Sequence, residues 1–475
     1  MGNLTPINIM KKMLLAVLTL SLMACQDEPK IDYVVLSGTV SNTNAKTVNI
    51  EHRDYNHKIE LKEGGAFSDT LFIEENGFHS FQLGRNSTVM YLKKGDNLNM
   101  TADVKTFAES LSYTGEGSVE NNYMAAKMVG KAETNNFVQF YSQEEPEFKS
   151  AIAKLKSDNE ERLNALENAD ETFVSLESQN LVYDEYEYLN TYVQRHGYYT
   201  KKENFEPSEG FIPDALENMS FDDATAYKSS SAYKNLAIQT TLDDLFLPIQ
   251  DQLPNVAPEQ LGMMNDIKIP ELKDDIVEFV GSFIVSPGNE NMESVYNFMS
   301  GLVSSEKVKT KLTEVYEKNK NLVKGKPSPE FLNYENHKGG QTSLADLKGK
   351  YVYVDVWATW CGPCIREIPS LKKVEEQFHN ENIEFVSTSI DELGSRDKWF
   401  DMVNDKELGG MQLMADNAWQ SDFVQAYGID GIPRFILIDP DGNIVSADAP
   451  RPSNPKLIEL LESELGIEEE SKMNP

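Results

Sequence analysis

Cysteine is scarce in this sequence, which contains only three cysteines in 475 residues. That number excludes a small scaffold held together by several disulfides. Basic residues are also few, with 44 Lys and Arg against 77 Asp and Glu, which gives a formal net charge of −33 at pH 7. Because so acidic a surface repels phosphates, the sequence excludes a nucleic-acid binder that works through a basic surface.

Histidines and long hydrophobic runs are scarce too. The six histidines are scattered, and none has a partner at metal-ligand spacing, so we assign no metal site and no cofactor. The apolar run at residues 13–24 is 12 residues long, too short for a bilayer core that needs about 20. No other segment is long and apolar enough to cross a membrane.

The short apolar run has the character of an export signal. It follows Lys11 and Lys12 and ends directly before Cys25, as in secretory signal peptides. Leu22-Met-Ala-Cys25 resembles the lipobox of bacterial lipoproteins, in which the chain is cut before a cysteine that then carries several acyl chains. We therefore expect Cys25 to anchor an extracytoplasmic chain to a bacterial membrane, in the periplasm or at the outer-membrane face. The alternative is an ordinary secretory peptide that leaves Cys25 as a free thiol.

The remaining chain divides into three parts by the period of its apolar residues. Between residues 33 and 113 they recur at every second position between glycine-containing turns, which predicts a small antiparallel β-sandwich. From about residue 119 to 321 the spacing is helical, and residues 324–329 form a linker rich in proline and glycine. We expect a signal peptide at 1–24, a β-sandwich at 25–118, an all-α domain at 119–322 and an α/β domain at 323–475.

The other two cysteines, Cys361 and Cys364, stand where an apolar strand, residues 351–356, gives way to a helix at 365–380. A helix N-terminus offers free N–H groups and about half a positive charge to a thiolate. Two intervening residues let the sulfurs meet, so the pair can cycle between dithiol and disulfide. A zinc site would need further ligands nearby, and haem attachment would need a histidine where Ile365 stands. A purely structural disulfide is the remaining alternative, but its loop is too small to stabilise much.

The segment Trp357-Ala-Thr-Trp-Cys-Gly-Pro-Cys364 resembles the active-site signature of thioredoxin. Asp355 and Pro369 stand in the matching places before and after it. The segment Tyr427-Gly-Ile-Asp-Gly-Ile-Pro433 resembles the cis-proline segment of the family, and residues 329–350 resemble the N-terminal hairpin of TlpA/ResA-type reductases. Residues 325–465 thus resemble a thioredoxin-like domain, and the domain order resembles that of exported Bacteroidetes-type lipoproteins.

The resemblance implies a role for each matching residue. Cys361, the more exposed thiol, would attack a substrate disulfide, and Cys364 would resolve the mixed disulfide. Asp355 would move the proton of Cys364, and Glu367, which matches an active-site glutamate of the ResA type, is a second candidate proton carrier. Its alternative is a solvated helix carboxylate.

The same resemblance implies a substrate-binding surface around the first cysteine. The loop before Pro433 would face the cysteines, and the Ile432 backbone would pair with an extended substrate chain. Trp360 and Pro363 would shape the surroundings of the exposed sulfur. Gly362-Pro363 is the dipeptide of thioredoxin itself and favours a reducing pair.

The favoured function is a lipid-anchored thiol:disulfide oxidoreductase that reduces protein disulfides, with apocytochrome c as one candidate substrate. A membrane protein of the DsbD or CcdA type would supply its electrons. A disulfide isomerase or oxidase, or a cell-envelope binding protein with an accessory redox domain, are the alternatives. A peroxiredoxin-type peroxidase needs a Pro-x-x-x-Thr-x-x-Cys arrangement and is excluded, because the residue seven before Cys361 is Val354 and Thr359 is only two before it.

Overall fold

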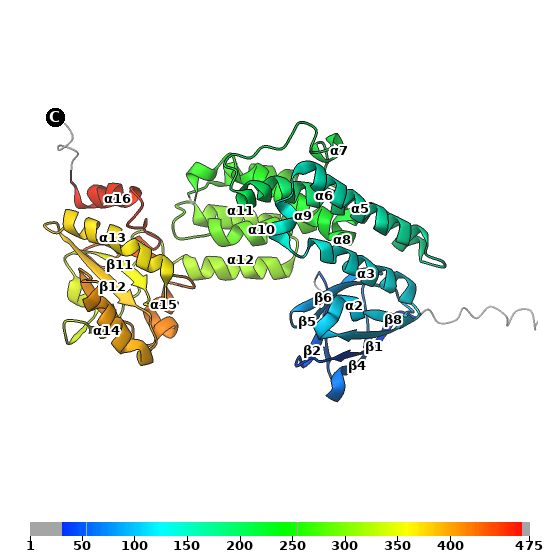
Figure 1. Cartoon of the computed structure of the whole chain (residues 1–475). Coiled ribbons are helices and arrows are strands. Elements are labelled where there is room, and N and C mark those ends of the chain that lie inside the picture. Colours follow the sequence, from blue (N-terminus) through cyan, green and yellow to red (C-terminus); the bar gives the residue numbers. More distant parts are fainter. Residues whose placement is uncertain (1–30, 54, 254, 468–475) are drawn as a thin grey trace, which may run out of the picture. The chain divides into compact units, whose positions relative to one another are not determined.

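We analysed a computed structural model that describes residues 31–53, 55–253 and 255–467 (Figure 1). The predicted signal peptide and Cys25 lie outside these residues. Within the described ranges no helix is both long and apolar enough to cross a membrane. The chain folds as two compact units that divide between Ala237 and Ile238.

The N-terminal part is a β-sandwich of two four-stranded sheets, in the orders β4-β1-β7-β8 and β3-β2-β5-β6. Apolar side chains alternate along its strands and meet in one core between the sheets. The pairing is antiparallel except between β1 and β7, which run parallel. The strands are β1 (Val34–Ser41), β2 (Thr47–His52), β3 (Tyr55–Glu60), β4 (Ala66–Leu71), β5 (Gly77–Leu83), β6 (Asn86–Leu92), β7 (Asn97–Asp103) and β8 (Ser112–Gly115).

Helices make up the middle of the chain. Before the division at Ala237, helices α5 and α6 pack together, and the apolar side chains on their facing sides, among them Phe148, Leu189 and Tyr192, form one core. The helices that precede the C-terminal domain are α2 (Phe107–Ser110), α3 (Ser118–Gly130), α4 (Phe137–Tyr141), α5 (Glu145–Asn164), α6 (Glu171–Thr200), α7 (Asp214–Glu217), α8 (Ala224–Ser229), α9 (Ser231–Phe246), α10 (Pro270–Ile284), α11 (Met292–Leu302) and α12 (Glu306–Asn319).

The C-terminal domain has a seven-stranded mixed sheet in the order β10-β9-β13-β12-β11-β14-β15. Its central strands are parallel, and β14 runs antiparallel beside β11. Its elements are β9 (Tyr334–Asn336), β10 (Gln341–Thr342), β11 (Tyr351–Trp357), α13 (Gly362–Gln377), β12 (Ile383–Ser389), α14 (Arg396–Asp405), β13 (Met411–Met414), α15 (Asp422–Ala426), β14 (Arg434–Ile438), β15 (Ile444–Ser446) and α16 (Lys456–Leu465).

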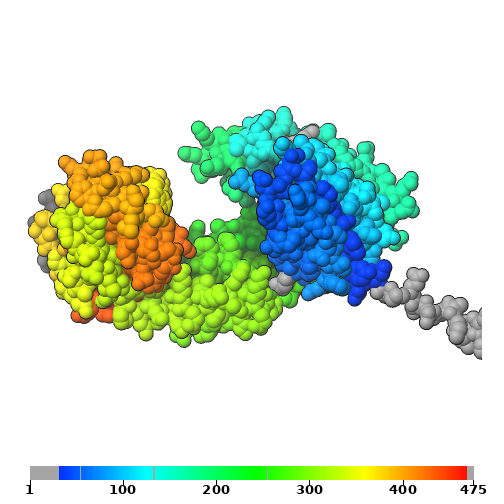
Figure 2. Space-filling view, turned by 90° about the horizontal axis from the view of Figure 1, so that it is seen from below, coloured from blue at the N-terminus to red at the C-terminus, as the bar shows by residue number. Residues whose placement is uncertain are grey.

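Two apolar cores cover the two faces of this sheet. Helices α13 and α16 pack on one face, and α14 and α15 on the other (Figure 1). Both faces of β11, an inner strand of the sheet, are therefore buried, which explains its nearly continuous apolar sequence. The space-filling view shows this domain in yellow to orange and the β-sandwich in blue (Figure 2).

The predicted fold class, a β-sandwich, a helical middle and an α/β thioredoxin-like domain, is confirmed. The strand expected at residues 351–356 is β11, which ends one residue later, at Trp357. The helix of the cysteine motif begins earlier than predicted, at Gly362, because Cys361 is its N-cap and Pro363 fits its first turn.

Candidate active site

The cysteine motif lies where β11 ends and α13 begins, and a buried carboxylate holds the connecting loop. Asp391, which follows β12 and is 1% exposed, accepts hydrogen bonds from the Thr359 backbone N–H at 2.8 Å and the Thr359 hydroxyl at 2.7 Å. The hydroxyl of Ser389 donates a third bond to it at 2.7 Å. These bonds fix the loop two residues before Cys361.

Cys361 and Cys364 form a disulfide across the first turn of α13, with Cα atoms 5.3 Å apart. The Sγ of Cys361 accepts a hydrogen bond from the Cys364 backbone N–H at 3.1 Å, so it occupies the N-cap position of the helix. A negative charge that forms on this sulfur is stabilised there by the N–H group and the helix dipole. Both cysteines are 4% exposed, so in this oxidised form Cys361 is not the more exposed of the two.

The loop before β14 faces the first cysteine. The peptide bond between Ile432 and Pro433 is cis, and the Ile432 carbonyl oxygen lies 3.8 Å from the Cys361 Sγ. The structure therefore brings together the predicted redox pair and the predicted cis-proline segment, which are about 70 residues apart in the sequence.

Two residues of the motif form the surface around the disulfide. Trp360 is 55% exposed, and its ring lies 6.3 Å from that of Trp419. Pro363 is exposed on the first turn of α13. An exposed indole is suited to contact a polypeptide, because large apolar side chains without cover are typical of contact sites.

Asp355 lies on β11 behind the disulfide and is 8% exposed. The Ser387 hydroxyl on the neighbouring strand β12 donates a hydrogen bond to it at 3.4 Å. Burial raises the pKa of Asp355 to about 7, and the negative charges of Glu375 and Glu367 add to this rise. The carboxyl group can therefore both take up and release a proton near neutral pH.

Glu367 lies one turn after Cys364, and its carboxylate holds a loop residue. It accepts hydrogen bonds from the Ser453 backbone N–H at 3.0 Å and the Ser453 hydroxyl at 2.9 Å. This carboxylate is engaged in anchoring the loop that precedes α16. Its predicted role as a proton carrier stays a prediction.

Sequence reasoning missed two carboxylates of this site. Asp391 directly follows β12, and an acidic residue at the carboxyl end of a central strand is the signal that could have found it. Glu375 lines a small cavity together with Asp355 and Cys364. Its position on the helix face of Cys364, eleven residues later, is the corresponding signal.

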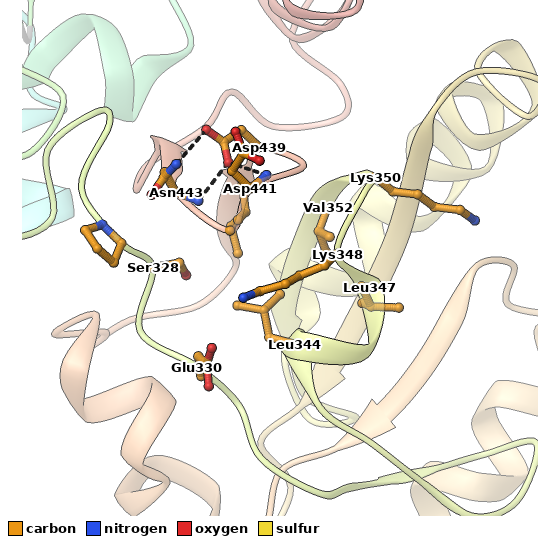
Figure 3. A pocket seen from close by; sticks show the side chains of 13 residues that line it. Ser328, Glu330, Leu344, Leu347, Lys348, Lys350, Val352, Asp439, Asp441 and Asn443 are labelled. Atoms are coloured by element: carbon orange, nitrogen blue, oxygen red, sulfur yellow. Dashed lines mark hydrogen bonds between the residues drawn. The ribbon is translucent and has the colours of Figure 1, made fainter.

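A larger pocket of about 220 Å³ lies at the opposite end of β11 from the cysteines (Figure 3). Asp439, Asp441 and Asn443 gather on one side of it, and Lys350 points away. Asp439 accepts hydrogen bonds from the backbone N–H groups of Asp441 and Asn443, at 2.9 and 2.8 Å. These bonds shape a turn, and the pocket has no connection to the redox pair.

Known proteins resemble the C-terminal part of this chain. The Redoxin family model matches residues 323–460. The thiol-disulfide oxidoreductase ResA of Bacillus thuringiensis is 32% identical over 121 residues; the match spans 26% of this chain and 66% of that relative, just under two thirds of its length. ResA of Bacillus subtilis is 27% identical over 131 residues, which are 28% of this chain and 70% of the relative. A solved structure from Bacteroides vulgatus, provisionally described as a thiol-disulfide oxidoreductase, is 48% identical, with 31% of this chain and 93% of that chain covered and a TM-score of 0.28.

The C-terminal domain is therefore a thioredoxin-like redoxin domain. Within that class it is of the TlpA/ResA type, as the cysteine motif and the ResA relatives indicate. The relatives named above are thiol-disulfide oxidoreductases, the predicted class of enzyme.

Proposed function

We propose that this chain is an exported thiol:disulfide oxidoreductase that reduces protein disulfides through Cys361 and Cys364. One observation carries the proposal: the Cys361 Sγ accepts the Cys364 N–H at the N-terminus of α13 and lies 3.8 Å from the Ile432 carbonyl. A sulfur in this position is favoured as a thiolate, and a backbone carbonyl beside it suits an extended polypeptide.

The reaction proceeds in two exchanges. The Cys361 thiolate attacks one sulfur of a substrate disulfide, and the other substrate sulfur leaves as a thiolate. Cys364 then gives its proton to Asp355 and attacks Cys361, which releases the second substrate thiol and forms the Cys361–Cys364 disulfide. Two electrons pass from the cysteine pair to the substrate, and a donor must return them.

The substrate-binding surface consists of Trp360, Pro363, Ile432 and Pro433. The exposed Trp360 provides apolar contact, and the Ile432 backbone provides hydrogen bonds that do not depend on the substrate sequence. Such a site accepts many extended chains, which suits a reductase of exported proteins. Apocytochrome c is one candidate.

The mature chain is anchored by lipid on Cys25 to a bacterial membrane, with the redox domain outside the cytoplasm. The signal-like residues 11–25 of the sequence support this location. A membrane protein of the DsbD or CcdA type would reduce the disulfide from within the membrane.

Insulin reduction tests the activity. We expect the full chain to reduce insulin disulfides with dithiothreitol as electron source, and Cys361→Ser to abolish this turnover because the thiol that attacks the substrate is missing. Cys364→Ser should trap a mixed disulfide with insulin, since the resolving thiol is missing. Full insulin reduction by Cys361→Ser would remove Cys361 as the nucleophile.

The redox potential of the pair tests the direction. The thioredoxin-like Gly362-Pro363 dipeptide leads us to expect a potential closer to about −270 mV than to about −120 mV, the values of a reducing and an oxidising family member. The measurement uses glutathione or dithiothreitol redox buffers. A value near that of the oxidising member would instead favour an oxidase or isomerase.

A further inference from the structure

Behind Cys364, helix α13 presents a continuous face to a small cavity. Cys364, Lys372 and Glu375 lie on this face at spacings of eight and three residues, so they are stacked along the helix. Asp355 of β11 and Ser387 of β12 form the opposite wall. The cavity measures about 10 Å³, close to the space that one water molecule needs.

The backbone of the loop before β13 makes room for the Glu375 carboxylate. A Cβ atom at Gly409 would collide with Glu375 Oε2, and one at Gly410 would lie 3.0 Å from Oε1. Gly410 also has a φ of +59°, which disfavours other residues there. Two consecutive glycines thus hold the carboxylate between the cavity and the surface, where Glu375 is partly exposed.

Few charges face Glu375. On its own helix Lys372 is the nearest cation, and its ammonium donates to the Lys406 carbonyl oxygen at 2.6 Å, at the end of α14. Lys338 donates to the Gly410 carbonyl oxygen at 3.4 Å. Across the cavity stands Asp355, and the side chains from β12 and β13, Ser387 and Gln412, are neutral.

The pKa values of Asp355 and Glu375 are both raised to near neutral pH. Burial raises the pKa of Glu375 to about 7, and the positive charge of Lys372 opposes this rise. The pKa of Asp355 is also raised to about 7, in part by the charge of Glu375. With both pKa values near 7, a proton can pass between the two groups without a large change in free energy.

We infer that Glu375 is a positioning residue for the catalytic proton: it exchanges this proton between Asp355 and solvent, and its charge sets the ionisation of Asp355. Asp355 is nearly enclosed, whereas Glu375 reaches the surface, so the cavity connects the buried acid to water. The inference rests on the proposed function, since it assigns a route to the proton that Cys364 must lose and regain.

The chemistry balances in both directions. When Cys364 attacks Cys361, its S–H bond breaks and the proton goes to the Asp355 carboxylate; Asp355 then returns to its charged form by giving a proton through the cavity to the Glu375 carboxylate. When a dithiol reduces the Cys361–Cys364 disulfide, the Cys364 sulfur leaves as a thiolate. Asp355 protonates it and is reprotonated from Glu375.

Reduction by dithiothreitol tests the inference without a protein substrate. The full-length oxidised chain is mixed with dithiothreitol between pH 5 and 9, and the fluorescence of Trp357 and Trp360 follows the disulfide. Rates are divided by the fraction of reagent thiolate. Glu375→Gln is compared with Glu376→Gln, which removes an exposed charge from the neighbouring position of α13.

We expect an inflection near pH 7 in the wild-type profile that moves about one unit lower in Glu375→Gln, because removal of a negative neighbour favours ionised Asp355. At pH 7 the rate should fall about fivefold, because the protonated fraction of Asp355 falls by that factor, which is less than the effect of losing a direct proton donor. Glu376→Gln should behave as wild type. Equal profiles of Glu375→Gln and Glu376→Gln would overturn the inference.

The same variants separate this inference from the proposed function. Wild-type protein that fails to reduce insulin, with a shifted profile in Glu375→Gln, would refute the reductase and support the proton route. Normal insulin reduction with an unshifted profile would refute the proton route alone.

Discussion

Asp355 is a carboxyl group that folding buries away from water: it is 8% exposed and lies on β11, an inner strand of the sheet. Because burial raises its pKa from 3.8 to about 7, the folded domain holds this proton where the unfolded chain has lost it. The stabilisation from the bound proton is therefore present below about pH 4 and is lost as the pH rises through 7.

Asp355→Asn removes this pH dependence. At pH 8 we expect the variant to have a free energy of unfolding higher by about 2–4 kcal/mol, because the wild type there buries a charge. At pH 4 the two proteins should differ little. All four tryptophans lie in the C-terminal domain, so their fluorescence in urea titrations of the oxidised proteins reports this domain. A lower stability of Asp355→Asn at pH 8 would contradict the assignment.

Some buried carboxylates can be recognised from the sequence and others cannot. Asp355 stands out because it interrupts an apolar strand. Glu375 does not, since a glutamate on an amphipathic helix has the same pattern whether it faces solvent or a cavity. What buries it is the loop at Gly409 and Gly410, more than thirty residues away, and such a contact is visible only once the fold is known.

At the scale of elements, the loop between β11 and α13 sets the position of the redox pair. Hydrogen bonds from Thr359 to the buried Asp391 hold this loop to the end of β12. The sequence predicts both flanking elements from their apolar periods. It does not predict the hydrogen bonds between Thr359 and Asp391, because a polar contact across 32 residues leaves no periodic signal.

Removal of the Asp391 carboxylate should destabilise the loop that it holds. In Asp391→Ala the Thr359 N–H and hydroxyl and the Ser389 hydroxyl lose their acceptor, so we expect the domain to lose about 3 kcal/mol of stability. Tryptophan fluorescence in urea measures the change. Asp401→Ala, an exposed position of α14, is the control and should stay within about 0.5 kcal/mol of wild type. A similar effect of both substitutions would show that the Asp391 carboxylate does not hold the loop.

For the whole molecule, the three parts predicted from the sequence do not coincide with the two compact units of the structure. Sequence periodicity changes at residues 119 and 323, where strands give way to helices and helices to the α/β domain. Compactness instead divides the chain between Ala237 and Ile238, inside α9. A helix keeps the same apolar spacing along its length even where its two ends pack into different cores, so this spacing cannot locate the division. The domain boundaries proposed from the sequence stay predictions.

The first compact unit contains a buried ion network, and all of its residues belong to that unit. Lys127 of α3 is 6% exposed, and its ammonium lies 2.5 Å from a Glu177 carboxylate oxygen and 2.8 Å from one of Asp184, both on α6. Such a network is costly to break, because removal of the cation leaves two carboxylates together out of water.

Lys127→Met should therefore destabilise the first unit alone. We expect a loss of about 3–5 kcal/mol there, seen as an earlier transition in far-ultraviolet circular dichroism. The tryptophan transition of the second unit should not move. Lys131→Met, which removes a partly exposed cation 3.5 Å from the same Asp184, should cost less than about 1 kcal/mol. If the tryptophan transition fell together with the dichroism transition in Lys127→Met, the two units would unfold as one, and the division at Ala237 would have no thermodynamic meaning.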